Sequence, residues 1–231
     1  MTETAEQLRV GGLTPLTTID YPGELAAVVY CQGCPWRCRY CQNGDLLDPD
    51  GGEPIDWADV VAFLETRRGL IDAVVFSGGE PTAQAALAAA LAEVRALGFK
   101  TGLHTGGPYP ERLERLVPLL DWIGLDVKAL PEDYPLVTGV PGSGDKAWRS
   151  LAALLAAGAN LEVRTTPMPG LDDHVYLDRL MQRLAAAGVR HYVLQTYRPE
   201  HRLDPELDLH GHQRPEDWRS HPFERLTIRD G

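Results

Sequence analysis

Residues 25–43 read LAAVVYCQGCPWRCRYCQN, an apolar run followed at once by a loop rich in cysteine. The run LAAVVYC at 25–31 is short and partly β-branched, which predicts a buried strand. The 231-residue chain contains four cysteines, which are Cys31 at the end of the run and Cys34, Cys38 and Cys41 in the loop. The stretch therefore predicts a strand whose carboxyl end leads directly into a chemically active loop.

Short apolar runs alternate with Ala/Leu-rich segments from this strand to about residue 196. The predicted strands are 25–31, 72–78, 100–105, 122–128, 160–166 and 191–196, and the predicted helices are near 56–68, 82–97, 110–119, 146–157 and 173–187. This alternation predicts an α/β fold of parallel strands with right-handed crossovers, either a doubly wound sheet or an incomplete barrel. We expect one domain over residues 1–231, with a core of about 24–197 and a C-terminal extension at 198–231.

Turn and cap residues mark the ends of several predicted helices. Pro81 and Thr82 are expected to open the second helix, and Gly98 follows its end. Gly158 and Gly188 are expected to close the last two helices. The extension is rich in Pro, His and charged residues, which predicts a loop-rich cover or a partly disordered segment.

Polar residues follow the predicted strands at their carboxyl ends. In parallel α/β folds these ends meet at one edge of the sheet, where active sites lie. Residues two apart share a face of a strand, so Asp126 and Lys128 are expected side by side, and Glu162 is an alternative ion partner for Arg164. The residues at the strand ends are Ser77, Gly78, Gly79 and Glu80 after the second strand, His104 after the third, Asp126 and Lys128 after the fourth, Arg164 and Thr166 after the fifth, and Gln195 after the sixth.

The cysteine cluster is open to three interpretations. Cys34, Cys38 and Cys41 have the spacing C-x3-C-x2-C, and three thiolates can hold three irons of a four-iron cluster while the fourth iron stays open for chemistry. A ferredoxin would use four cysteines for each cluster. A structural zinc site would also use four, but zinc ribbons separate their two C-x2-C pairs much more widely.

Composition excludes several classes of partner. The formal net charge of −11 argues against nucleic acid and against docking on an anionic membrane. No apolar run approaches the ~20 residues that span a bilayer, and the N-terminus MTETAEQLRVGG lacks the pattern of a signal peptide. We expect a cytoplasmic protein without a membrane partner, in which reduced thiols serve as metal ligands rather than disulfides.

Two motifs resemble those of the radical S-adenosylmethionine (radical SAM) superfamily: the C-x3-C-x2-C spacing with Tyr40, and FSGGEP at 76–81. The resemblance implies a partial (β/α)6 barrel with a [4Fe–4S] cluster and S-adenosylmethionine (SAM) bound at its open iron. Cys31 would not be a ligand. The implied cluster ligands are Cys34, Cys38 and Cys41, and the implied SAM-binding residues are Tyr40 near the adenine, Gly78, Gly79 and Glu80 at the methionyl ammonium, and Asp126, Lys128, Arg164 and Gln195 elsewhere in the pocket.

A closer resemblance covers most of residues 11–199. IDYPG at 19–23 and the loop from Gln32 to Asn43 are similar to the opening of anaerobic ribonucleoside-triphosphate reductase activating proteins, and LDVKA at 125–129, EVRTT at 162–166 and YVLQTYRP at 192–199 continue the similarity. It implies that the protein generates a glycyl radical on such a reductase, with electrons from a low-potential donor such as flavodoxin or ferredoxin. Arg37 and Arg39 could favour binding of an acidic electron-donating reductase, or they could be solvated loop charges.

Two other functions stay open. One is a radical SAM enzyme acting on a small molecule such as a 7-deazaguanine precursor, and the other is a non-catalytic iron–sulfur or zinc-binding module. Related activating enzymes often read D-T-N-G where this chain has His104, Thr105, Gly106 and Gly107, so no cation site is predicted there. His104 is either structural and neutral or functional.

Overall fold

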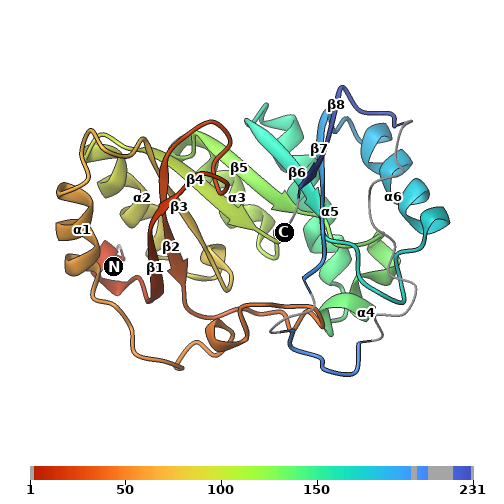
Figure 1. Ribbon diagram of the computed structural model, residues 1–231, viewed down its shortest axis with the longest axis horizontal. Helices are drawn as coiled ribbons and strands as arrows, with labels where there is room; N and C mark the ends of the chain where they lie inside the picture. Colours follow the sequence, from red (N-terminus) through yellow and green to blue (C-terminus); the bar gives the residue numbers. More distant parts are fainter. Residues whose placement is uncertain (1–2, 199–201, 208–220, 230–231) are drawn as a thin grey trace.

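A single sheet forms the frame of the protein in the computed structural model, which describes residues 3–198, 202–207 and 221–229. Its strands run in chain order, and all are parallel except β1, which is antiparallel to β2. A doubly wound sheet would reverse its strand order, so the order seen here is that of a partial barrel (Figure 1). The strands are β1 (Val10–Thr17), β2 (Ala26–Cys31), β3 (Ala73–Gly78), β4 (Lys100–Thr105), β5 (Trp122–Asp126), β6 (Leu161–Thr165), β7 (His191–Gln195) and β8 (Arg225–Arg229).

The predicted strands correspond to β2 through β7, and the α/β partial barrel is confirmed. Two further strands extend the sheet. β1, VGGLTPLT, was missed because its glycines and Pro15 weaken the strand signal. β8 lies within the extension, where we expected loop or disorder, and pairs in parallel with β7. The rest of that expectation, at 199–201, 208–220 and 230–231, lies outside the described residues.

Helices cover the outer face of the sheet. The five predicted helices correspond to α1, α2, α3, α5 and α6, whereas the short α4 was not predicted. Gly98, Gly158 and Gly188 follow helix ends with positive φ angles, as expected. The helices are α1 (Trp57–Glu65), α2 (Leu87–Ala96), α3 (Pro110–Leu116), α4 (Tyr134–Thr138), α5 (Ser143–Ala156) and α6 (His174–Ala186).

The predicted start of the second helix was wrong. Pro81 opens only a 3-10 turn, Pro81–Ala83, and α2 begins at Leu87. The reason is the Glu80 side chain, which accepts a hydrogen bond from the Thr82 amide and so uses this segment to hold the strand end.

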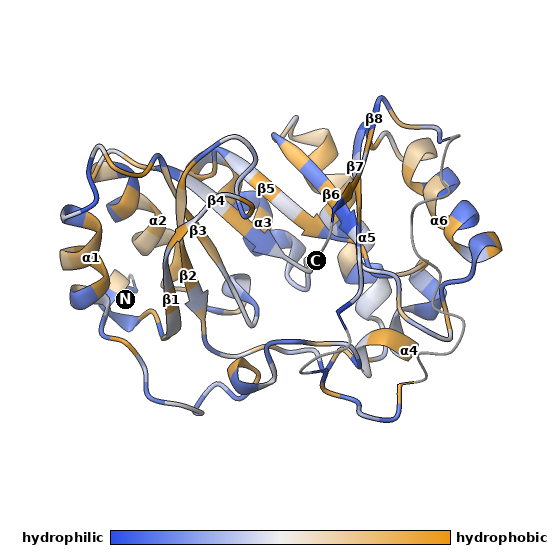
Figure 2. Ribbon diagram, in the orientation of Figure 1, coloured by the Kyte–Doolittle hydropathy of each residue, from blue (hydrophilic) through white to orange (hydrophobic). Residues whose placement is uncertain are grey.

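Alternation along the strands separates two apolar cores. Outward side chains such as Val29, Cys31 and Phe76 pack with the helices in the larger core. Inward side chains form a smaller core in which Tyr21 and Trp122 lie with ring centroids 5.2 Å apart. Strands β2 and β3 are mostly hydrophobic, and α1 and α6 each show one hydrophobic and one hydrophilic side (Figure 2). The smaller core fills one part of the barrel interior and leaves the carboxyl ends of the strands for polar groups.

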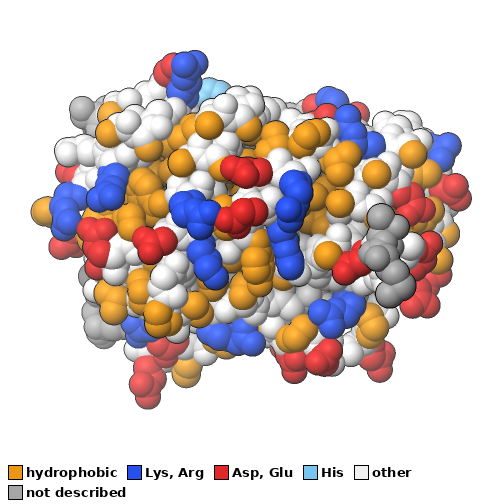
Figure 3. Space-filling view, turned by 180° about the vertical axis from the view of Figure 1, so that it is seen from behind, with side chains coloured by type: hydrophobic (Ala, Val, Ile, Leu, Met, Phe, Trp, Pro, Cys, Tyr) orange, Lys and Arg blue, Asp and Glu red, His pale blue; other side chains and the backbone are white. Residues whose placement is uncertain are grey.

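The surface carries charges of both signs. On the side opposite to the view of Figure 1, acidic and basic side chains lie next to one another among hydrophobic ones (Figure 3). Within the described residues, no helix combines the length and apolar character needed to cross a membrane.

Candidate active site

A cavity of about 310 Å³ lies at the carboxyl ends of the parallel strands. Its walls come from the cysteine loop and from the ends of β3, β4, β5, β6 and β7. All eleven residues expected to bind the cluster or SAM line it, although they are far apart in the sequence. They are Cys34, Cys38, Cys41, Tyr40, Gly78, Gly79, Glu80, Asp126, Lys128, Arg164 and Gln195.

The cysteine loop presents three of its thiols to this cavity. Cys34, Cys38 and Cys41 line the cavity, whereas Cys31 is buried in the larger core and does not line it. All four thiols are free. In a four-iron cluster each iron takes one thiolate, so the thiols need not converge on one point. A single zinc ion would need such convergence, and no three His, Cys, Asp or Glu side chains within the described residues have it. The thiol set therefore fits a [4Fe–4S] cluster.

Burial controls the ionisation of these thiols. It raises the pKa of Cys34 to about 12 and the pKa of Cys38 to about 11, and the carboxylate of Glu80 adds to the effect at Cys34. The thiols of Cys34 and Cys38 are therefore protonated at neutral pH in the absence of metal. Since iron binds thiolates, assembly of a cluster must release these protons.

Backbone hydrogen bonds hold the cysteine loop in place. The amide of Arg37 donates to the carbonyl of Thr138 at 3.0 Å, and the amide of Arg39 donates to the carbonyl of Val137 at 3.0 Å. The guanidinium of Arg37 donates to the carbonyl of Cys34 at 2.6 Å. The short helix α4 and the loop thus stabilise each other, which gives α4 a place in the site that the sequence did not reveal.

The glycines of the GGE motif lie against the cysteine loop. Gly78 has a φ of +107°, and a Cβ on it would lie 2.5 Å from the Cys31 nitrogen. A Cβ on Gly79 would lie 2.4 Å from the Gly33 oxygen. The Gly79 amide donates to the Cys31 carbonyl at 2.9 Å. We expected these glycines to let the backbone approach a ligand, and here they let two backbone segments approach each other.

Glu80 is a buried carboxylate that connects β3 to β4. Oε1 accepts hydrogen bonds from the Thr82 amide at 3.0 Å, the Thr82 hydroxyl at 2.5 Å and the Thr105 hydroxyl at 2.7 Å. Oε2 accepts from the Gly106 amide at 3.0 Å. Burial raises the pKa of Glu80, and these donors oppose that rise. Beyond placing negative charge at the cavity, Glu80 therefore fixes the relative position of two strand ends.

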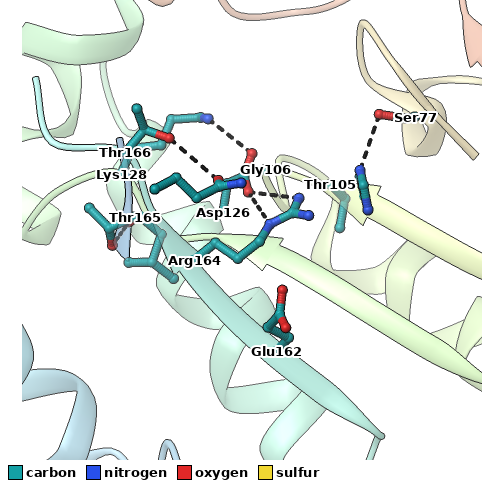
Figure 4. Close-up of polar contacts among 12 residues, drawn as sticks. Ser77, Thr105, Gly106, Asp126, Lys128, Glu162, Arg164, Thr165 and Thr166 are labelled. Carbon is teal, nitrogen blue, oxygen red and sulfur yellow. Dashed lines mark hydrogen bonds and ion pairs between the residues drawn. The ribbon is translucent and has the colours of Figure 1, made fainter. Parts of the chain in front are cut away.

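A charged row on the inner face joins β5 and β6. Nε and Nη2 of Arg164 both lie 2.9 Å from Oδ1 of Asp126, and Nζ of Lys128 lies 3.5 Å from Oδ2 (Figure 4). Burial alone would raise the pKa of Asp126, but Arg164 and Lys128 outweigh burial and lower it to about 2. Burial would likewise lower the pKa of Lys128, but Tyr40 and Asp126 keep it well above its usual value. The row carries one surplus positive charge, which suits a ligand carboxylate.

Two further residues define the geometry of Arg164. Glu162, its alternative partner, instead makes a two-pronged ion pair with Arg229 of β8 at 3.0 and 3.1 Å. Gly124 lies beneath the guanidinium, and a Cβ there would lie 2.8 Å from Nη1 of Arg164. The extension therefore contributes to the barrel interior through Arg229, which sequence similarity did not cover.

His104 is neutral and held on both sides. Its Nε2 lies 2.8 Å from the carbonyl of Asp20, which can only accept, so Nε2 carries the hydrogen. Nδ1 is then an acceptor for the Ser77 hydroxyl at 3.4 Å. Burial, with the charge of Arg164, lowers the pKa of His104 to about 3. His104 is therefore a neutral, structural residue that also lines the cavity.

Several other lining residues were not among the predicted cofactor-binding residues, although Ser77, His104 and Thr166 were expected at the strand ends. The side-chain amide of Asn43 donates to the Gly78 carbonyl at 3.1 Å. Trp36 occupies the space beside Gly106, where a Cβ would lie 2.5 Å from the indole. This packing explains why glycine stands at position 106. The full additional set is Trp36, Gln42, Asn43, Leu47, Ser77, His104, Thr105, Gly106, Thr166, Thr196, Tyr197 and Arg198.

Comparison with known proteins identifies the class. The radical SAM superfamily pattern matches residues 28–180, about two thirds of the chain, and the chain belongs to this superfamily. It is 30% identical over 192 residues to the pyruvate formate-lyase-activating enzyme of Streptococcus mutans, across 75% of this chain and 72% of that enzyme. It is 28% identical over 206 residues to a Methanocaldococcus jannaschii protein named as a glycyl-radical enzyme activating enzyme, across 86% of this chain and 83% of that protein. Within the superfamily its relatives are thus the glycyl-radical activating enzymes.

Solved structures share the fold. Escherichia coli QueE superimposes with a TM-score of 0.56 at 19% identity, over 82% of this chain and 84% of QueE. Streptococcus suis SuiB bound to SAM superimposes with a TM-score of 0.61 at 16% identity, over 74% of this chain but only 40% of SuiB. The protein is a radical SAM enzyme of the activase type and uses a [4Fe–4S] cluster and SAM.

Proposed function

We propose that the cavity holds both cofactors and that the protein generates a glycyl radical on an anaerobic ribonucleoside-triphosphate reductase. The observation that carries the cofactor assignment is that Cys34, Cys38 and Cys41 share one cavity with the charged row of Asp126, Lys128 and Arg164. When bound and reduced, the cluster with SAM supplies a 5′-deoxyadenosyl radical that removes a hydrogen atom from a glycine Cα.

The residues of the cavity bind and orient SAM in this proposal. Lys128 and Arg164 attract the carboxylate, while Asp126 keeps both cations in place. The turn of Gly78 and Gly79, with the negative charge of Glu80, receives the ammonium. Tyr40 packs near the adenine, and its ring already lies 5.6 Å from Nζ of Lys128. Gln195, which lies 3.4 Å from the Thr166 hydroxyl, completes the far wall.

The choice of the reductase as partner is supported by the segment before β2. Residues 19–23 read IDYPG, as in the reductase activating proteins. In this chain the Asp20 carbonyl accepts from His104, and Tyr21 packs inside the barrel, so these two residues anchor the segment to the barrel interior. A flavodoxin or ferredoxin is the proposed electron donor.

We also propose that residues 1–231 act as one domain, since β1 and β8 belong to the same sheet as the core strands. For the small-molecule alternative, a 7-deazaguanine precursor, the solved structures give no support, because likenesses at 19% identity and below concern the fold alone.

The test is anaerobic reconstitution with iron and sulfide, followed by reduction in the presence of SAM. Failure to form 5′-deoxyadenosine would refute the SAM chemistry. The reduced enzyme is then mixed separately with an anaerobic ribonucleotide reductase and with pyruvate formate-lyase. We expect the glycyl-radical doublet in electron paramagnetic resonance on the reductase. A doublet only on pyruvate formate-lyase would contradict the proposed partner.

A further inference from the structure

The cysteine loop is a partition with two different faces. Cys34, Trp36 and Cys38 line the cavity, whereas the intervening Pro35 and Arg37 do not line it and are exposed. A single layer of loop residues therefore separates the thiols from solvent on this side. An electron arriving at this outer face would have the shortest path to a cluster held by the thiols.

Two exposed leucines flank the outer face of the loop. Leu136 of α4 is 58% exposed, and it precedes Val137 and Thr138, whose carbonyls accept from the loop. Leu203 is 40% exposed and precedes Asp204, whose amide donates to the Arg39 carbonyl at 2.8 Å. The cysteine loop, α4 and the segment 202–207 lie together at the lower edge of Figure 1. We call Pro35, Arg37, Arg39, Leu136 and Leu203 the outer loop patch.

The charges of the patch are unequal. Arg39 is neutralised by Asp204, with Nε 2.7 Å from Oδ2. Arg37 donates to the carbonyls of Cys34 and Trp36, and within the described residues to no carboxylate, so its positive charge faces outward. The whole chain has a net charge of −11, which repels an acidic protein over most of its surface. Arg37 is therefore an exposed cation on a loop whose two neighbouring segments each present an exposed leucine, so an acidic partner gains both apolar contact and attraction there.

We propose that the outer loop patch is the docking surface for a small acidic electron-transfer protein that reduces the cluster. The inference rests on the proposed cofactor assignment. One electron leaves the donor and enters the cluster, and no proton or leaving group moves. The donor does not need to enter the cavity, so the cavity mouth at Gln42, Asn43 and Arg198 stays open to the glycyl-radical partner. A small patch suits this task, because electron-transfer encounters have small interfaces.

The experiment compares two reductants on the reconstituted enzyme. Leu136→Glu and Leu203→Glu place a negative charge on the patch without touching any cavity residue. Leu70→Glu is the matched control, because Leu70 is 62% exposed and lies before β3, at the opposite end of the strands. Binding of a flavodoxin and the rate of 5′-deoxyadenosine formation are measured with flavodoxin, and the rate is measured again with dithionite, which needs no docking.

We expect both patch variants to lose about tenfold in flavodoxin affinity and in flavodoxin-driven rate, a loss typical of a repulsive charge at an interface. Their dithionite-driven rate should match that of the unaltered enzyme and of Leu70→Glu. Unchanged flavodoxin binding, or an equal loss with both reductants, would overturn the docking surface. So would normal flavodoxin reduction with loss of glycyl-radical formation, which would assign the patch to the protein substrate. If the unaltered enzyme forms no 5′-deoxyadenosine with dithionite, the proposed function fails instead.

Discussion

The ion pair of Arg164 and Asp126 should be a large determinant of stability in the cofactor-free protein. The Arg164 side chain is only 6% exposed and that of Asp126 is 32% exposed, so Arg164→Met leaves a largely buried carboxylate without its nearest cation. Breaking a buried pair in this way costs about 3–5 kcal/mol. Lys128 still lies 3.5 Å from Asp126 and attracts it. We therefore expect a loss near the lower end, about 3 kcal/mol in the free energy of unfolding.

Urea unfolding followed by circular dichroism measures this loss, with Arg95→Met as the control. Arg95 and Asp121 are similarly close, at 2.8 Å, but their side chains are 38% and 35% exposed, so that pair is worth about 1 kcal/mol at most. Adding Asp126→Asn to Arg164→Met should recover part of the loss, because the carboxylate left without Arg164 is removed, while Lys128 loses only an attraction over 3.5 Å. Equal losses in the two single variants, or no recovery in the double variant, would refute the reasoning.

The pH dependence of this loss has a defined sign. In the unaltered protein the pKa of Asp126 is about 2, below its usual value, so the ion pair stabilises the fold above the pKa of the unfolded carboxyl group and is lost as the pH falls toward 2. Without Arg164, burial raises the pKa of Asp126 and the carboxyl group takes up a proton earlier. The loss in the free energy of unfolding caused by Arg164→Met should therefore become smaller as the pH is lowered from 7 to 4.

Changes at three further positions test the site. Gly124→Ala places a Cβ 2.8 Å from Nη1 of Arg164 and should cost about 1–3 kcal/mol in stability and weaken SAM binding, as measured by urea unfolding and calorimetric titration. Cys31→Ala should keep about four irons and SAM cleavage, whereas loss of the cluster in iron analysis would contradict ligation by three thiolates. His104→Asn retains an acceptor for the Ser77 hydroxyl and should bind SAM more tightly than His104→Gln. The affinity of the unaltered enzyme for SAM should be constant between pH 6 and 8, since the pKa of His104 is about 3. A histidine-dependent step in that pH range would show that the ring is not neutral.

The parts of the fold that were predictable are those with a strong local signal. Strands β2, β3, β5 and β7 are mostly buried apolar runs, β4 and β6 follow the same alternation of strand and helix, and Gly98, Gly158 and Gly188 mark helix ends, so pattern alone locates them. β1 and α4 were not found because each depends on a partner. β1 is held by pairing with β2, and α4 is five residues long and contacts the cysteine loop through two carbonyls.

The candidate site was predictable by residue but not by contact. Alternation placed Asp126 with Lys128 on one face, as the structure has it. It could not show that Arg164 pairs with Asp126 rather than with Glu162, because that choice depends on Arg229, 65 positions further along the chain. The contacts of Glu80 with Thr105 and of His104 with Asp20 likewise join separate segments, and no local pattern reports them.

The place of Arg229 has a practical consequence for shortened versions of the enzyme. The family motifs recognised in the sequence end near residue 199, which invites removal of everything beyond it. Such a truncation would delete β8 and leave Glu162 without its guanidinium, on the same strand face as Arg164. The freed carboxylate would then compete with Asp126 for Arg164. A protein trimmed to its recognisable core would keep every motif and yet have a differently charged barrel interior.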